Sequence, residues 1–87
     1  MKLLYCPECK DIVRLKKMPK TCDCGKVGGR YLEDGLLIEY YGADAIPLFI
    51  ANSSFVTAIR RRPDSAPGSK FDAGVIPKDC DTIRYHE

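Results

Sequence analysis

Two close pairs of cysteines near the N-terminus constrain this chain of 87 residues more than any other feature of its sequence. Cys6 and Cys9 form the first pair, with two residues between them. Cys22 and Cys24 form the second pair, with one residue between them and Gly25 directly after. Twelve residues separate the pairs, which is enough for a short antiparallel excursion along residues 12–16 and back. Such a path brings the second pair beside the first, so we expect the four sulfurs to meet.

Four sulfurs that meet at one point form a metal-binding set. Thiolates bind Zn²⁺ at about 2.3 Å, and four of them complete a closed tetrahedral site. We therefore predict one structural Zn²⁺ held by Cys6, Cys9, Cys22 and Cys24. Iron in the same cage and a set of reduced thiols without metal stay open as alternatives. A thioredoxin-like redox pair fits less well, because it needs a following helix, whereas residues 11–16 alternate as a strand does.

The two cysteine pairs resemble the knuckles of the zinc-ribbon family, which presents CPxC and CxxCG motifs at the tips of two β-hairpins. The resemblance covers about residues 4–27. The chain departs from the family at Lys10, where glycine is common, and at the second knuckle, which is CxC followed by Gly25. The shorter pair implies a tighter bite, so one of its thiolates could be strained or replaced. The rest of the chain is similar to small uncharacterised ribbon proteins of phages and bacteria, a resemblance that implies no activity.

The length of the chain predicts a single small domain, residues 1–87, in which residues 1–27 form the ribbon portion and residues 28–87 form a hairpin, a helix and C-terminal strands. A domain this short buries only about two thirds of the surface of its unfolded chain, so a bound metal would add needed stability. The opening apolar run is too short for a signal peptide, and no run of about 18 apolar residues could span a membrane. We expect a cytoplasmic protein with no membrane partner.

The remaining patterns predict a β-rich α+β fold. One helix is expected over about residues 53–62, with N-caps in Asn52–Ser54, an apolar stripe after them, and the arginines of residues 60–62 near its C-terminus. Pro63 would end the helix, and a surface loop would follow over residues 63–70. The stripe consists of Phe55, Val56 and Ile59.

The dipeptide Asp34-Gly35 predicts a β-hairpin with a two-residue type I′ turn. Pairing Glu33 with Leu36 sets Tyr31 opposite Ile38 and Arg30 opposite Glu39. One face would then be apolar and the other would hold an ion pair. The apolar face would contain Tyr31, Leu36, Ile38 and Tyr40. Further strands are expected over residues 12–17, 71–76 and 82–85, and residues 48–51 fit a strand or a lead-in to the helix.

The net charge of +2 is too small to imply a polyanionic partner, but the first 30 residues carry eight Lys or Arg against three acids. Arg14 and Lys16, as alternate residues of the expected strand, would share one face. Candidate anion or nucleic-acid contacts are Lys10, Arg14, Lys16, Lys17 and Lys20. The arginines at 60–62 fan around a helix and line no single side.

The sequence contains no recognisable catalytic set, so we expect a protein that is not an enzyme. Phosphate-binding glycine motifs are absent. Cys80 lies between Asp79 and Asp81, whose charges should raise its pKa, and His86 is the only histidine. We interpret Cys80 as a buried or idle thiol, with a spare metal ligand as the alternative.

These expectations favour a non-enzymatic zinc-binding protein that serves as a protein-interaction or regulatory module. Its partner would be another protein, and the candidate contact face is the half-apolar side of the hairpin formed by Leu32, Leu37 and Tyr41. The alternative is a nucleic-acid-binding ribbon that uses the basic N-terminal residues, because zinc ribbons often act on nucleic acid or its polymerases.

Overall fold

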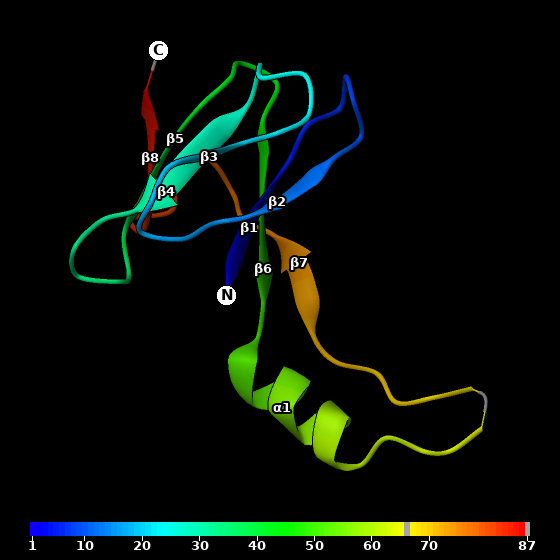
Figure 1. Cartoon of the computed structure of the whole chain (residues 1–87). Helices are drawn as coiled ribbons and strands as arrows, with labels where there is room; N and C mark the ends of the chain where they lie inside the picture. The colour runs from blue at the N-terminus through cyan, green and yellow to red at the C-terminus, as the bar shows by residue number, and fades with distance from the viewer. Residues whose placement is uncertain (66, 87) are drawn as a thin grey trace.

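The computed structural model describes residues 1–65 and 67–86 and shows the strand-rich α+β fold that the sequence predicts (Figure 1). The described part of the chain contains eight short strands and one helix. In chain order they are β1 (Lys2–Tyr5), β2 (Ile12–Arg14), β3 (Lys20–Thr21), β4 (Gly28–Tyr31), β5 (Ile38–Tyr41), β6 (Ile46–Ile50), α1 (Asn52–Arg60), β7 (Ala73–Val75) and β8 (Ile83–His86).

The first four-stranded sheet has the order β2-β1-β6-β7 and is antiparallel throughout. Its central strand β1 pairs with β2 on one side and with the distant β6 on the other. Leu4 lies opposite Val13 and Pro47, and all three are buried. Residues on this side of the sheet therefore face the core, and their chain neighbours face away from it.

The second sheet has the order β3-β4-β5-β8, in which β8 runs parallel to β5. The β4–β5 hairpin has the predicted register, with Tyr31 opposite Ile38 and Arg30 opposite Glu39. The expected ion pair is present, because Arg30 Nε lies 2.9 Å from Glu39 Oε1. Ile38 is fully buried, which confirms the apolar face at this position.

The turn of this hairpin differs from the predicted type I′ geometry. A type I′ turn needs positive φ at both Asp34 and Gly35, but only Gly35 has it. The Asp34 carboxylate instead accepts hydrogen bonds from the backbone N–H groups of Leu36 and Leu37, each at 3.0 Å. The loop is consequently wider, and Leu36 is 67% exposed, so its placement on the buried face was wrong.

The excursion expected along residues 12–16 also differs from the structure. β2 ends at Arg14 and pairs with β1, whereas β3 pairs with β4, so the chain does not fold back on itself between the two cysteine pairs. Beyond β2 it crosses to the other sheet, where the Lys16 carbonyl accepts a 2.8 Å hydrogen bond from Tyr31 N–H. Leu15 is buried and its N–H donates to the Lys2 carbonyl at 3.3 Å, so Arg14 and Lys16 are alternate exposed residues as expected, although Lys16 lies beyond β2.

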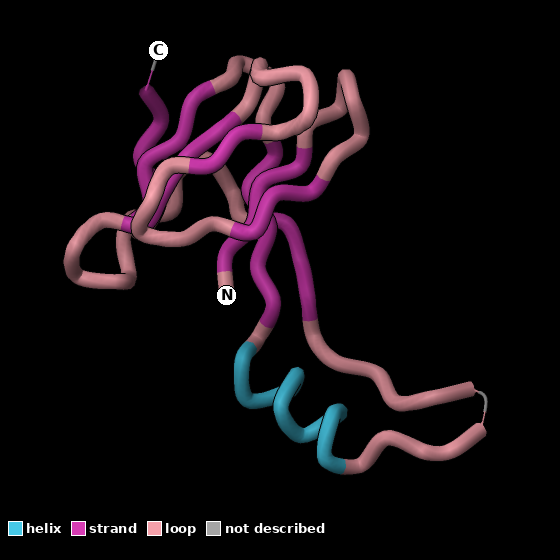
Figure 2. The backbone as a smooth tube through the Cα atoms, in the orientation of Figure 1, coloured by secondary structure: helices cyan, strands magenta, loops and turns pink. Residues whose placement is uncertain are grey.

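The core lies between the two sheets. The largest side chains with almost no exposure come from both halves of the chain and include Leu4, Val27 and Ile38. Cys6 and Cys22 belong to the same buried cluster. The two sheets and the cysteine knuckles are thus parts of one packed unit (Figure 2).

Helix α1 projects away from the sheets at the end of β6 (Figures 1 and 2). It begins at Asn52 after the N-cap Ala51, with no side-chain cap, so the expected Asn52–Ser54 caps are wrong. The Ser54 hydroxyl accepts a hydrogen bond from Asp72 N–H instead. The helix ends at Arg60, ahead of Pro63, and only Ala58 in it is buried.

Phe55 in the stripe of α1 packs against the segment that returns toward β7, where its ring meets that of Phe71 edge to face at 4.9 Å, whereas Val56 and Ile59 are exposed. Helix α1 and the segment around Phe71 form an arm that projects from the sheets. The chain consequently has a radius of gyration of 14.2 Å, against about 12 Å for a compact domain of this length. Apart from Ala66, which lies outside the described residues, the loop expected over residues 63–70 is exposed.

Among the described residues no helix is long and apolar enough to cross a membrane.

Candidate metal centre

The first cysteine knuckle is the turn between β1 and β2. Cys6 N–H donates to the Asp11 carbonyl at 3.0 Å, and Lys10 N–H donates to the Cys6 carbonyl at 2.7 Å, so both bonds close the loop that holds Cys9. Lys10 adopts a left-handed backbone with φ of 60°. Glycine adopts this conformation at no steric cost, which explains why it is common at this position in zinc ribbons.

The second knuckle is the turn between β3 and β4. Cys22 N–H donates to the Val27 carbonyl at 2.9 Å, and Gly25 N–H donates to the Cys22 carbonyl at 3.1 Å. Gly25 has a φ of 78°, so the tight reversal after Cys24 depends on a residue without a Cβ atom. Each cysteine pair therefore lies at the tip of its own hairpin, as the resemblance to zinc ribbons implies.

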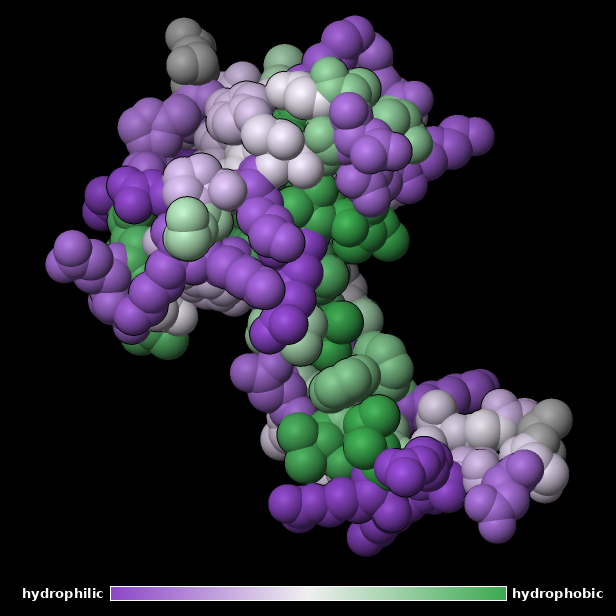
Figure 3. Space-filling model, in the orientation of Figure 1, coloured by the Kyte–Doolittle hydropathy of each residue, from purple (hydrophilic) through white to green (hydrophobic). Residues whose placement is uncertain are grey.

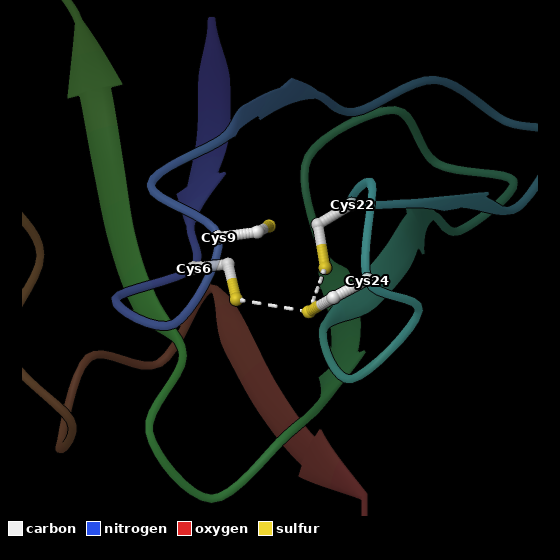
Figure 4. Close-up of side chains that lie close together, drawn as sticks. All are labelled: Cys6, Cys9, Cys22 and Cys24. Carbon is white, nitrogen blue, oxygen red and sulfur yellow. Dashed lines mark hydrogen bonds between the residues drawn. The ribbon is translucent and has the colours of Figure 1, made fainter.

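The four cysteine side chains converge from the two knuckles (Figure 4). Their Sγ atoms all lie within 4.8 Å of one another. The Sγ of Cys24 is 3.7 Å from that of Cys6 and 3.5 Å from that of Cys22. A tetrahedron with metal–sulfur bonds of about 2.3 Å has edges of about 3.8 Å, whereas a disulfide needs about 2.05 Å. The separations fit four ligands of one metal ion, and both sulfurs of the short CxC knuckle take part.

The cluster is closed on its inner side and open on its outer side. Cys6 and Cys22 are buried, Cys9 is half-buried and Cys24 is exposed. Burial by itself raises the pKa of Cys22, but a backbone hydrogen bond from Val27 and the neighbouring thiols lower that pKa to about 6. The backbone at Lys26 lowers the pKa of Cys24, but the other thiols and desolvation outweigh it and raise that pKa to about 12. The four sulfurs could therefore be ionised together only if a cation offset their charge.

Two polar contacts brace the knuckles against each other. Asp23 N–H in the second knuckle donates to Asp11 Oδ2 beside the first at 3.1 Å. Lys26 forms an ion pair with Glu8, and this carboxylate, together with the field of the nearby thiols, raises the pKa of Lys26. Sequence reasoning missed both contacts, because neither pair is adjacent in sequence and no motif marks them.

The structure places the candidate anion contacts on the surface without gathering them on one element. All five side chains are exposed, and none forms an ion pair with a described residue. They lie in the first knuckle, at the end of β2, in the crossing segment and at the start of β3. In that order they are Lys10, Arg14, Lys16 with Lys17, and Lys20.

The candidate partner face lies on one side of the β4–β5 hairpin. Leu32 and Leu37 are half-buried and joined by a 2.8 Å backbone hydrogen bond, and the 37% exposed Tyr41 lies at the far end, over Gly28. The Arg30–Glu39 ion pair lies between them, because alternate residues of a strand share a face. A shallow hollow on this sheet is lined by Pro19, Lys20, Arg30, Glu39, Tyr41 and His86.

Cys80 and His86 lie outside the four-cysteine cluster. Cys80 is half-buried and packs against the core. Its pKa is lowered, chiefly by a hydrogen bond with the Thr82 hydroxyl at 3.2 Å. Asp81 raises this pKa as expected, but Thr82 outweighs it, so the expected net rise was wrong. His86 Nε2 lies 3.0 Å from Glu39 Oε2. Neither residue extends the metal centre.

No protein-family model matches the chain, and comparisons with curated proteins and with solved structures find no significant match. The resemblance to zinc ribbons therefore rests on the cysteine motifs and on the two hairpins that carry them.

Proposed function

We propose that the chain is a small, non-enzymatic zinc-binding protein that acts as a protein-interaction or regulatory module. One observation carries the metal part of this proposal: four Sγ atoms from two hairpins lie within 4.8 Å of one another. Four thiol ligands would complete a closed tetrahedral site, whereas catalytic zinc sites have three protein ligands, so the set favours a structural role.

The position of the cluster explains what a metal would do. Cys6 and Cys9 follow β1 in one sheet, whereas Cys22 and Cys24 precede β4 in the other. Bound Zn²⁺ would supply positive charge to offset the thiolates and would cross-link the two sheets. The cysteines would bind it, and the contacts of Asp11 with Asp23 and of Glu8 with Lys26 would hold the knuckles in register.

Elemental analysis of the purified protein tests the metal assignment. We expect one zinc per chain in the wild type, a large loss in Cys22→Ser, and full retention in Cys80→Ser, which is a matched control because Cys80 lies outside the cluster. Iron in place of zinc would colour the protein. A folded wild type that contains no metal would refute the assignment.

The interaction role is motivated by the half-apolar face that contains Leu32, Leu37 and Tyr41, with the Arg30–Glu39 pair at its centre. Protein contacts are enriched in aromatic residues and in Arg, and this face carries Tyr41 and Arg30. A pull-down at native salt should recover a protein partner with the wild type and less of it with Tyr41→Asp. If no partner is retained, or if Tyr41→Asp retains the same amount, this face is not the contact surface.

Nucleic-acid binding is the second candidate, and it is motivated by five exposed basic side chains that form no ion pair with a described residue. Phosphate contacts release counterions, so the logarithm of the binding constant should fall with the logarithm of salt by about 0.9 per neutralised phosphate. A salt titration with labelled duplex and single strands discriminates the two roles. Absent or salt-independent binding would exclude this candidate.

A further inference from the structure

The sheet formed by β2, β1, β6 and β7 carries a second apolar side that faces away from the core. Leu3 lies opposite Leu48, which lies opposite Val75, and Tyr5 lies opposite both Ile12 and Ile46. Because directly opposed residues of antiparallel strands share a side, these six side chains project together from four strands. We call this set the outer apolar face.

The outer apolar face is open to solvent among the described residues. Ile12 and Val75, on the two edge strands, are 55% and 65% exposed, and the four residues between them are half-buried. Helix α1 does not cover the sheet, because it projects beyond the end of β6 (Figure 1). Figure 3 shows hydrophobic residues gathered beside β2 and along the arm toward α1. The main contiguous apolar patch of a soluble protein is often a functional contact site.

The charge pattern and the shape of the face indicate its occupant. Arg14, at the corner on β2, is the one charged side chain that the strand registers place on this side. A partner must therefore present an almost uncharged apolar surface. Two sheets pack face to face about 10 Å apart and about 30° from alignment when both are apolar and have the same twist. A second copy of the chain meets these conditions.

We propose that the outer apolar face is the contact between two copies of this chain, packed sheet on sheet about a two-fold axis. In such a contact each residue meets the same set on the other copy, so the near absence of charge avoids like-charge repulsion. The two Arg14 side chains lie at corners and can remain in solvent. This proposal does not depend on the identity of the metal or on the Leu32, Leu37 and Tyr41 face.

The area of the face sets the expected strength of the dimer. Four strands about 4.8 Å apart, with three to five residues each at about 3.4 Å per residue, give a footprint of roughly 250 Å². Stable complexes bury about 800 Å² per partner, so the sheet supplies part of the interface. The arm adds apolar surface next to it, because Val56, Ile59 and Phe71 are 43%, 46% and 41% exposed. We expect a dimer that dissociates on dilution in the micromolar range.

Sedimentation velocity of the full, metal-loaded chain tests the proposal over about 1 to about 200 µM, the range of a modest interface. The wild type should reach twice the chain mass of 9.7 kDa. Ile12→Glu and Val75→Glu place a charge at opposite edges of the face and should remain at 9.7 kDa. Leu36→Glu is the control, because Leu36 is 67% exposed on the other sheet, and this variant should dimerise as the wild type does.

Several results would overturn the proposal. A wild type that stays monomeric, or that forms open-ended polymers, would show that no closed dimer forms. Dissociation by Val75→Glu with no effect of Ile12→Glu would indicate pairing along the β7 edge instead. Circular dichroism and zinc content show whether each variant is folded. Methyl chemical shifts of Leu3, Ile12 and Leu48 in the unsubstituted protein should change on dilution, and constant shifts would equally refute the contact.

Discussion

Removal of the metal should unfold the chain rather than loosen it, and the expected size of the effect follows from two quantities. Small domains are stable by about 0.05–0.15 kcal/mol per residue, which gives roughly 4–13 kcal/mol for 87 residues. Structural zinc in small domains contributes about 10–16 kcal/mol of apparent binding free energy at neutral pH. The metal would therefore account for most or all of the stability of the folded chain.

The structure shows why the loss would spread beyond the knuckles. Cys6 and Cys22 belong to the same buried cluster as Leu4 and Ile38, which lie in different sheets. Without the cation, thiolates held about 3.5–3.7 Å apart would repel one another, or the thiols would bind protons and move apart. Either outcome disturbs the packing between the sheets.

The assay is a thermal melt followed by far-ultraviolet circular dichroism, with and without a strong chelator, and with metal content measured on the same samples. We expect the chelated chain to lose its cooperative transition and to regain it when zinc is returned. Cys80→Ser should behave as the wild type does under both conditions. If a verified metal-free sample melts at the same temperature as the loaded protein, the metal does not stabilise this fold.

Three further predictions concern single residues. Ile38→Ala should lower the free energy of unfolding by about 2–5 kcal/mol in a urea titration, because Ile38 is fully buried between the sheets; a smaller change would mean that the site collapses around the cavity. Gly28→Ala should destabilise by about 1–3 kcal/mol, because its Cβ would lie 2.6 Å from the Tyr41 hydroxyl and 2.7 Å from the Lys20 carbonyl; an unchanged melt would show that both neighbours can move. Arg30, and then His86, lower the pKa of Glu39. The stability that this carboxylate adds is therefore fully present at pH values above its ordinary pKa near 4.5, and it is lost as the pH falls through the lowered pKa. Melting temperature should consequently fall less in Glu39→Gln than in the wild type as pH drops from 5 to 3, and parallel curves would contradict this account.

The cysteine cluster and the β4–β5 register could be predicted because both depend on local spacing. Two cysteines at a knuckle are brought together because only one or two residues separate them, and hairpin pairing follows from the position of the turn. The turn geometry could not be predicted in the same way. The Asp34 carboxylate bonds two backbone N–H groups, an option that competes with the type I′ conformation.

The sheet order could not be read from the sequence. Alternation shows which side of a strand is apolar, but it does not show which strand lies beside it. The pairings of β1 with β6 and of β5 with β8 join segments far apart in the chain, and no sequence signal specified them. The same limit explains α1, where Phe55 meets the ring of Phe71 instead of a sheet and the other two residues of the expected stripe, Val56 and Ile59, are exposed.

The parallel pairing of β8 with β5 has a consequence for the order in which the molecule assembles. All four cysteines lie within residues 6–24, so the knuckle hairpins can close around a metal through local contacts alone. The edge of β5, by contrast, is paired only when β8 reaches it, and residues 42–82 separate these two strands. Because long-range pairings form slowly, we expect refolding to show an early phase at the knuckles and a later one at β8. Pulse-labelling of backbone amides would reveal this sequence of events. Simultaneous protection of Cys22 N–H, which donates to the Val27 carbonyl in the second knuckle, and of Ile38 N–H, which donates to the Thr82 carbonyl beside β8, would exclude it.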